Sequence, residues 1–269
     1  MTELQGGLPV GWDAHVHVFA ADAPVRAGHY QPIARPLAEI EAVGLAHHVG
    51  HLVLIQPSVY GTDNSVLLDA LHAQPGRHRG VVVVDPSIDS RQLDEMHEAG
   101  VRGIRFNLVS PVGERGDEAY LDGLAPTLRR LGWHVQWYVD TAALPRLVAL
   151  QRRTGLSFVL DHLAGMHPHA AYDAQAWAAL GILAAAGSWI KLSGWYRLQA
   201  EEPYVELDPI IDRIAKLFTS RLVWGSDWPH TSFAADKAPR YGSTWEPVVR
   251  VLGDRRANEV RVAARLLYA

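Results

Sequence analysis

Two histidines that are one residue apart, His15 and His17, stand in the apolar run Gly11–Phe19 near the start of the chain. In an extended strand, residues i and i+2 point to the same face of the sheet, so both imidazoles would project together. Such a pair at the end of a strand can hold a metal ion or polarise a carbonyl group. Two core histidines with satisfied hydrogen bonds would give the same pattern, so the pair needs support from the rest of the chain.

Eight short apolar, β-branched runs recur along the chain, and each is followed by a segment with helical spacing. Near-continuous apolar runs indicate strands buried on both faces, as in a parallel sheet covered by helices. The predicted strands are Trp12–His17, His51–Gln56, Gly80–Asp85, Val101–Asn107, Trp133–Val139, Ser157–His162, Trp189–Ser193 and Leu222–Asp227. The predicted helices are Pro36–His48, Ser65–His72, Gln92–Glu98, Tyr120–Arg130, Ala143–Thr154, Ala171–Ala186, Asp208–Phe218 and a final helical region at Thr244–Tyr268. This alternation, without a Gly-x-Gly-x-x-Gly or P-loop motif, predicts an α/β fold: a single-domain (β/α)8 TIM-type barrel over residues 1–269.

Polar residues gather at the carboxyl ends of these strands, where barrels of this kind build their active sites. His15 and His17 end the first strand, His162 ends the sixth and Asp227 ends the eighth. We therefore expect these four side chains to converge on one mouth of the barrel. Other polar residues at or just after strand ends are Ser58, Arg105, Asn107, Tyr138, Ser193, Tyr196 and His230.

Each main candidate has a structural alternative. Asp161 and His162 are adjacent in an apolar strand, so only one of them is expected to face the barrel interior, and His162 is favoured. Asp227 is either a helix N-cap or a buried base, and the nearby histidines favour the base. Arg105 lies within an apolar strand, where an unpaired charge is costly, so a structural ion pair and a functional role are both consistent with it.

Composition excludes several classes of function. The net charge is −4, from 25 basic and 29 acidic residues, and no block of like charge occurs, which disfavours nucleic acid and anionic membranes as partners. The chain has no cysteine, so a bound metal would be held by His and carboxylate groups. No signal-peptide pattern and no membrane-spanning apolar run is present in the sequence, so a cytoplasmic location is expected.

Five segments, in this order, resemble the amidohydrolase-related family, and within it the lactonase-like branch that includes 2-pyrone-4,6-dicarboxylate lactonase and sugar-acid lactonases. The segments are Trp12-Asp13-Ala14-His15-Val16-His17, Gln56-Pro57-Ser58-Val59-Tyr60-Gly61-Thr62-Asp63-Asn64, Gly103-Ile104-Arg105-Phe106-Asn107, Leu160-Asp161-His162 and Val223-Trp224-Gly225-Ser226-Asp227-Trp228-Pro229-His230. The resemblance implies a distorted (β/α)8 barrel with a hydrolytic site. It also implies that His15 and His17 are the family's first-strand pair, that His162 is its later histidine and that Asp227 is its general base.

The sequence departs from that family in two respects. Many superfamily members hold two metals bridged by a carboxylated lysine or a glutamate, but the corresponding strand ends here offer Tyr138 and Ser193, so a binuclear site is not expected. The extra arginines of the dicarboxylate lactonase are missing from the loops that follow Arg105 (Leu108-Val109-Ser110-Pro111) and His162 (Leu163-Ala164-Gly165), which makes a doubly anionic pyrone a poor substrate. Contacts to one carboxylate, to sugar hydroxyls or to a stacked ring are expected from Arg105, Ser58, Tyr138, Tyr30, Trp195, Arg197 and His230.

The predicted reaction is hydrolysis of a small cyclic ester, a sugar-acid or carboxylated lactone. Asp227 would take a proton from the attacking water, while His15, His17 and His162 would stabilise the carbonyl oxygen on which charge develops. The same four residues are a suitable set for a single Zn²⁺ or another divalent ion with water in an open position. Because the branch that the chain resembles works without an obligatory metal, the first expectation is that no cofactor is required.

Two other interpretations stay open. A mononuclear Zn-dependent hydrolase or decarboxylase would use the same scaffold, and a non-catalytic binding protein is the alternative of a different class. A binding pocket has no need for a carboxylate base beside three histidines, which favours an enzyme. The expected partner is a small-molecule lactone, with neither nucleic acid nor membrane, and a homo-oligomer is left open.

Overall fold

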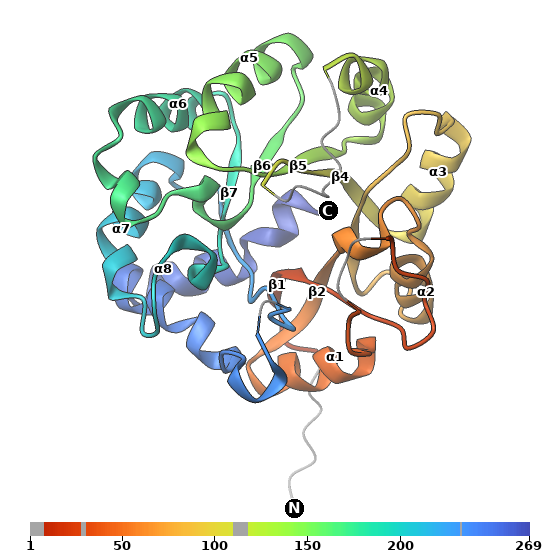
Figure 1. Cartoon of the computed structure of the whole chain (residues 1–269), viewed down its shortest axis with the longest axis horizontal. Helices are drawn as coiled ribbons and strands as arrows, with labels where there is room; N and C mark the ends of the chain where they lie inside the picture. The colour runs from red at the N-terminus through yellow and green to blue at the C-terminus, as the bar shows by residue number, and fades with distance from the viewer. Residues whose placement is uncertain (1–7, 28–30, 110–117, 232) are drawn as a thin grey trace, which may run out of the picture.

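Eight parallel strands form one sheet, and each strand is hydrogen-bonded to the next in the order β1 to β8 (Figure 1). The computed structural model describes residues 8–27, 31–109, 118–231 and 233–269. The strands are β1 (Gly11–Val16), β2 (Val49–Ile55), β3 (Arg79–Val82), β4 (Val101–Asn107), β5 (His134–Tyr138), β6 (Phe158–Leu160), β7 (Trp189–Leu192) and β8 (Leu222–Trp224). The predicted (β/α)8 barrel is confirmed.

Helices alternate with the strands and surround them (Figure 1). They are α1 (Leu37–Ala46), α2 (Ser65–Ala73), α3 (Ser90–Ala99), α4 (Glu118–Leu131), α5 (Leu144–Thr154), α6 (Ala174–Ala185), α7 (Asp208–Phe218) and α8 (Glu246–Leu267). Glycines follow the ends of several of them: Gly100, Gly132 and Gly155 have φ of +110°, +67° and +64°, a region that residues with a side chain rarely adopt. Among the described residues, no helix has both the length and the hydropathy that crossing a membrane requires.

The barrel closes between β1 and the chain that follows β8. The backbone N–H of Asp227 donates to the carbonyl of His15 (2.9 Å), and the N–H of His17 donates to the carbonyl of Trp228 (2.9 Å). Helix α8 packs against both β1 and β8 and covers this seam. Closure of the barrel therefore brings together residues that are more than 200 positions apart in the sequence.

The strands that carry the site are shorter than predicted. β6 ends at Leu160 and β8 ends at Trp224, so His162 and Asp227 lie beyond the regular strands. Both residues adopt a left-handed backbone, with φ of +48° and +64°. For a residue other than glycine this conformation costs about 1–2 kcal/mol. It also ends the alternation of side chains between the two faces of the sheet, which the sequence argument had assumed.

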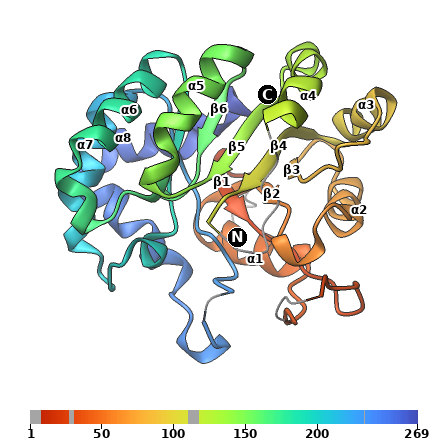
Figure 2. The same cartoon turned by 45° about the horizontal axis from the view of Figure 1, so that its top comes forward.

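The end of the barrel opposite the site residues is closed by the C-terminal residues. Tyr268 is fully buried and lies edge-on to His134, with ring centroids 5.1 Å apart. Arg79 Nε donates to the carbonyl of Tyr268 and Arg102 Nε donates to that of Ala269, each at 2.9 Å. In Figure 2 the segment after β1 (red) lies at the lower right of the view, and the segment after β8 (blue) lies at the bottom.

Candidate active site

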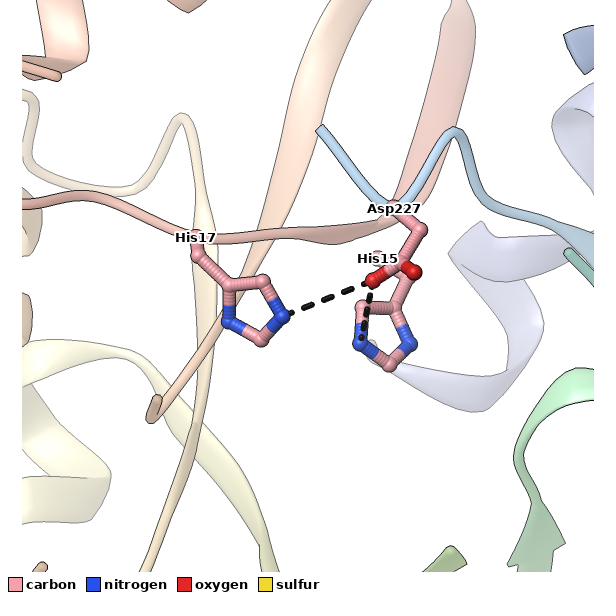
Figure 3. Close-up of side chains that lie close together, drawn as sticks. All are labelled: His15, His17 and Asp227. Carbon is pink, nitrogen blue, oxygen red and sulfur yellow. Dashed lines mark ion pairs between the residues drawn. The ribbon is translucent and has the colours of Figure 1, made fainter. Parts of the chain in front are cut away.

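Asp227 and the histidine pair meet at the closure of the barrel (Figure 3). The Oδ1 atom of Asp227 lies 3.6 Å from His15 Nε2 and 3.5 Å from His17 Nε2. All three residues are buried, with 0 to 7% of their surface exposed. The predicted convergence of these residues is therefore present in the structure.

Hydrogen bonds on the far side of the rings orient the two imidazoles. His17 Nδ1 donates to the carbonyl of Ile55 (2.8 Å), so in the neutral ring Nε2 carries a lone pair that faces Asp227. His15 Nδ1 lies 3.3 Å from Asp161 Oδ1, and burial lowers the pKa of His15 well below its usual value. Within the described part of the chain, His15 Nε2 and Asp227 Oδ1 have no hydrogen-bond partner. Electron-rich atoms thus face one another across a small buried gap.

This arrangement fits a single divalent cation. Donors around a tetrahedral zinc ion with bonds of about 2.0–2.1 Å lie about 3.4 Å apart, close to the 3.6 and 3.5 Å that separate Asp227 Oδ1 from His15 Nε2 and His17 Nε2. The outer partners, a carbonyl for His17 and a carboxylate for His15, are those that commonly orient metal-binding histidines. The described residues therefore include a possible ligand set: His15, His17 and Asp227.

The second oxygen of Asp227 is held by two donors. Tyr196 donates its hydroxyl to Oδ2 (2.7 Å), and Arg197 Nε donates to the same atom (2.5 Å). Burial raises the pKa of Asp227, but Arg197 and the neighbouring histidines more than offset this and hold it well below its usual value. The carboxylate is therefore ionised at neutral pH, with Oδ1 facing the histidines.

A second buried carboxylate, Asp161, lies on the inner side of His15. It accepts from Gln136 Nε2 (3.0 Å) and Arg105 Nε (3.3 Å), and its Oδ1 is 3.4 Å from Lys191 Nζ. Lys191 is fully buried, and burial lowers its pKa to about 8. His15, Asp161 and His162 form another group with closely spaced donor atoms, but the Lys191 ammonium already supplies a cation beside Asp161.

His162 contacts the same cluster from the other side. Its ring centroid is 4.8 Å from that of His15, and its Nδ1 is 2.9 Å from the hydroxyl oxygen of Ser193. Burial lowers the pKa of His162 to about 4, so the ring is neutral at neutral pH. Gly194 allows this approach, because a Cβ at that position would lie 2.3 Å from His162 Nδ1.

Comparison with known proteins identifies the family of the chain. A family model described as amidohydrolase matches residues 12–246. The chain belongs to this family. It is 32% identical over 242 residues to 2-pyrone-4,6-dicarboxylate hydrolase of Comamonas testosteroni, a match that covers 83% of this chain and 78% of the relative. It is 29% identical over 232 residues to 4-sulfomuconolactone hydrolase of Hydrogenophaga intermedia, which covers 84% of this chain and 76% of the relative. A solved Pseudomonas putida structure described as a 2-pyrone-4,6-dicarboxylic acid hydrolase has a TM-score of 0.84, 30% identity and 97% coverage of both chains. The protein is thus a hydrolase of the amidohydrolase superfamily.

The amidohydrolase structure corrects one prediction at the end of β6. Asp161 and His162 were expected to point to opposite sides, yet both contact His15. The reason is that β6 ends before them and His162 takes the left-handed conformation, so strand alternation no longer applies. Arg105 does form the structural ion pair that was one of its two interpretations, and its guanidinium also lies 5.6 Å from the Tyr138 ring centroid.

The other predicted contact residues differ in their surroundings. Ser58 Oγ accepts from Asn107 Nδ2 (3.1 Å), and Tyr138 lies edge-on to His162 with centroids 5.0 Å apart. His230 is 2% exposed, with its ring 5.7 Å from that of Tyr196. The placement of Trp195 differs from the expectation of a stacking residue: it is 1% exposed in the hydrophobic core, and its indole N–H donates to the Thr244 carbonyl (2.8 Å). Tyr30 lies outside the described residues.

Sequence reasoning missed three buried polar residues of this amidohydrolase: Asp13, Gln136 and Lys191. Asp13 accepts from the backbone N–H groups of His15 (3.1 Å) and Ser226 (2.9 Å) and from the Tyr241 hydroxyl (2.8 Å), so it ties β1 to the segment after β8. Burial raises its pKa to about 6. The available signal was a polar or charged residue at an inward position of an apolar strand, which is costly unless it is paired.

Proposed function

We propose that this amidohydrolase hydrolyses a small lactone, with Asp227 as the general base. The observation that carries the proposal is the buried, ionised carboxylate whose Oδ1 faces two histidines while Oδ2 is fixed by Tyr196 and Arg197. The names of several relatives agree with it, since they include 4-sulfomuconolactone hydrolase and an L-fucono-1,5-lactonase from Burkholderia ambifaria, which is 28% identical over 242 residues.

The reaction follows from the positions of the donors and acceptors. A water beside Asp227 Oδ1 gives up a proton to the carboxylate as its oxygen attacks the lactone carbonyl. The Ser193 hydroxyl can donate to His162 Nδ1 and so keep a proton on Nε2, which then donates to the carbonyl oxygen as negative charge develops. The ring C–O bond breaks, Asp227 returns its proton to the departing oxygen, and the product is a hydroxy acid.

A single divalent ion is the second candidate for the task of stabilising the carbonyl oxygen. It is favoured by the bond from His17 Nδ1 to Ile55, because His17 can then donate from Nε2 only when the ring is positively charged. His15 Nε2, His17 Nε2 and Asp227 Oδ1 would hold the ion. Such an ion polarises a carbonyl group and lowers the pKa of water toward about 7.

A panel of monocarboxylated and sugar lactones, read with a pH indicator, tests the proposal. Hydrolysis by the wild type should fall by about 10²- to 10⁴-fold in Asp227→Asn, the usual contribution of a general base. Asp212→Asn is the matched control, because Asp212 forms an exposed i,i+4 ion pair with Lys216 on α7. Unchanged hydrolysis by Asp227→Asn would remove Asp227 from the catalytic role.

Metal analysis separates the two candidates for stabilisation of the oxygen. Stoichiometric Zn²⁺ in the purified protein, with activity that is lost on chelation and regained on adding the ion back, would establish the ion. Full activity in metal-free protein would assign the task to the histidines alone.

A further inference from the structure

A cavity of about 140 Å³ lies beside the active site, between the segment after β1 and the segment after β8. It is lined by Phe19, Gln31, Pro32, Ile33, Arg35, Pro229, Thr231, Phe233 and Ala238. In the segment after β1, Phe19 and Arg35 exchange backbone hydrogen bonds (2.9 and 2.8 Å). In the segment after β8, Pro229 follows Asp227 by two residues.

Two residues of the cavity wall lie beside side chains of the active site. The Phe19 ring is 6.3 Å from that of His17. The Phe233 ring is 4.9 Å from that of Tyr196, whose hydroxyl donates to Asp227 Oδ2. A group bound in this cavity would therefore contact Phe19 and Phe233, the rings that lie beside His17 and Tyr196.

Most residues of the lining are apolar, and the polar ones are Gln31, Arg35 and Thr231. Phenylalanine, isoleucine, proline and alanine side chains make up most of it, and Ile33 and Phe233 remain 65% and 38% exposed. Among the lining residues that the structure describes, the charged one is Arg35, and its guanidinium is neutralised by Glu39 at 2.9 Å. The described lining thus offers more apolar than polar surface and no unpaired charge, which suits an uncharged hydrocarbon group better than a carboxylate.

We propose that this cavity is the subsite for an apolar substituent of the lactone, a group of the size of a phenyl ring or a short alkyl chain. A cavity of about 150 Å³ with an apolar lining is large enough to hold benzene, so the volume matches a group of that size. This inference rests on the proposed lactone hydrolysis and narrows its substrate class from polyhydroxylated sugar lactones to lactones with a hydrocarbon side group.

Two lactones that differ in one substituent test the subsite: γ-phenyl-γ-butyrolactone and γ-(hydroxymethyl)-γ-butyrolactone. We expect kcat/KM of the wild type to be at least about tenfold higher for the phenyl compound, the lower end of what a fitted apolar group contributes in an enzyme pocket. Ile33→Asp places a charge in the cavity and Ala238→Phe fills it. Each should remove the preference while changing kcat/KM for the hydroxymethyl compound less than about twofold. Ile182→Asp on α6 is the matched control, because Ile182 is also an exposed isoleucine (39%) but does not line the cavity.

Binding to the Asp227→Asn variant, followed by ligand-observed NMR, keeps this test independent of turnover. Tighter binding of the phenyl compound, weakened at least about tenfold by adding Ile33→Asp but not Ile182→Asp, supports the subsite even if neither lactone is hydrolysed. If hydrolysis is absent for the whole lactone panel, the proposed function fails while the cavity can still be confirmed. The proposed subsite is overturned if the phenyl and hydroxymethyl compounds bind equally tightly and have equal kcat/KM. It is also overturned if Ile33→Asp and Ile182→Asp have equal effects.

Discussion

Replacing Gly194 by alanine should displace His162 and expose its contribution to catalysis. Residue 194 has φ of +60°, so a Cβ costs about 1–2 kcal/mol in backbone strain alone. The new Cβ would also lie 2.3 Å from His162 Nδ1, while non-bonded atoms pack at about 3.5 Å, so the ring must move by about 1 Å. That movement breaks the 2.9 Å bond to Ser193, worth about 1 kcal/mol. We expect unfolding to become easier by about 2–3 kcal/mol and kcat/KM to fall about 100-fold, the usual cost of a 1 Å displacement.

Gly155→Ala separates the strain from the displacement of the ring. Gly155 ends α5 with φ of +64°, and a Cβ there would meet no atom within 4 Å, so the variant carries the same strain without a clash. Urea unfolding gives the stability of both variants, and steady-state hydrolysis of the best lactone of the panel gives their activity. We expect Gly155→Ala to lose about 1–2 kcal/mol of stability and no activity. Equal activities of the two variants would refute the reasoning that His162 must keep this position.

Three further predictions concern buried polar groups. Burial raises the pKa of Asp13 from 3.8 to about 6, so the folded state binds the proton more tightly than the unfolded state and this residue's contribution to stability falls as pH rises from about 4 to 6. Across that window, urea unfolding should therefore show the free energy of unfolding of Asp13→Asn rising by about 3 kcal/mol relative to that of the wild type. The same pH dependence in both proteins would contradict this prediction. Lys191→Met removes the ammonium beside buried Asp161 and should lower the free energy of unfolding by about 3 kcal/mol, whereas a loss below about 1 kcal/mol would mean that Arg105 and Gln136 are sufficient partners. The buried hydroxyl of Tyr268 has no hydrogen-bond partner among the described residues, so Tyr268→Phe should leave the melting temperature unchanged or raise it, and a clear decrease would reveal an ordered partner such as a water.

The sequence pattern predicted the barrel and grouped four candidate site residues. The chain alternates apolar runs with amphipathic segments that have glycine at their ends. Few folds other than a helix-covered parallel sheet bury such runs on both faces, so the number and order of the strands could be predicted from this pattern. Parallel strands place their carboxyl ends on one side, which is why His15, His17, His162 and Asp227 could be grouped without coordinates. Composition also restricted any metal ligands to His and carboxylate groups, because the chain has no cysteine.

The tertiary structure decided how those groups are oriented and what surrounds them. Local sequence patterns carry no record of the left-handed backbone at His162 and Asp227, two residues whose side chains both lie against His15. The pairing of Asp161 with Lys191 links β6 and β7 inside the barrel, and only packing shows that two charges in separate apolar strands neutralise each other. The histidine pair with which the sequence began is likewise defined by distant residues, since Ile55 and Asp161 set the ring orientations and Asp227 is brought to it across the seam of the barrel.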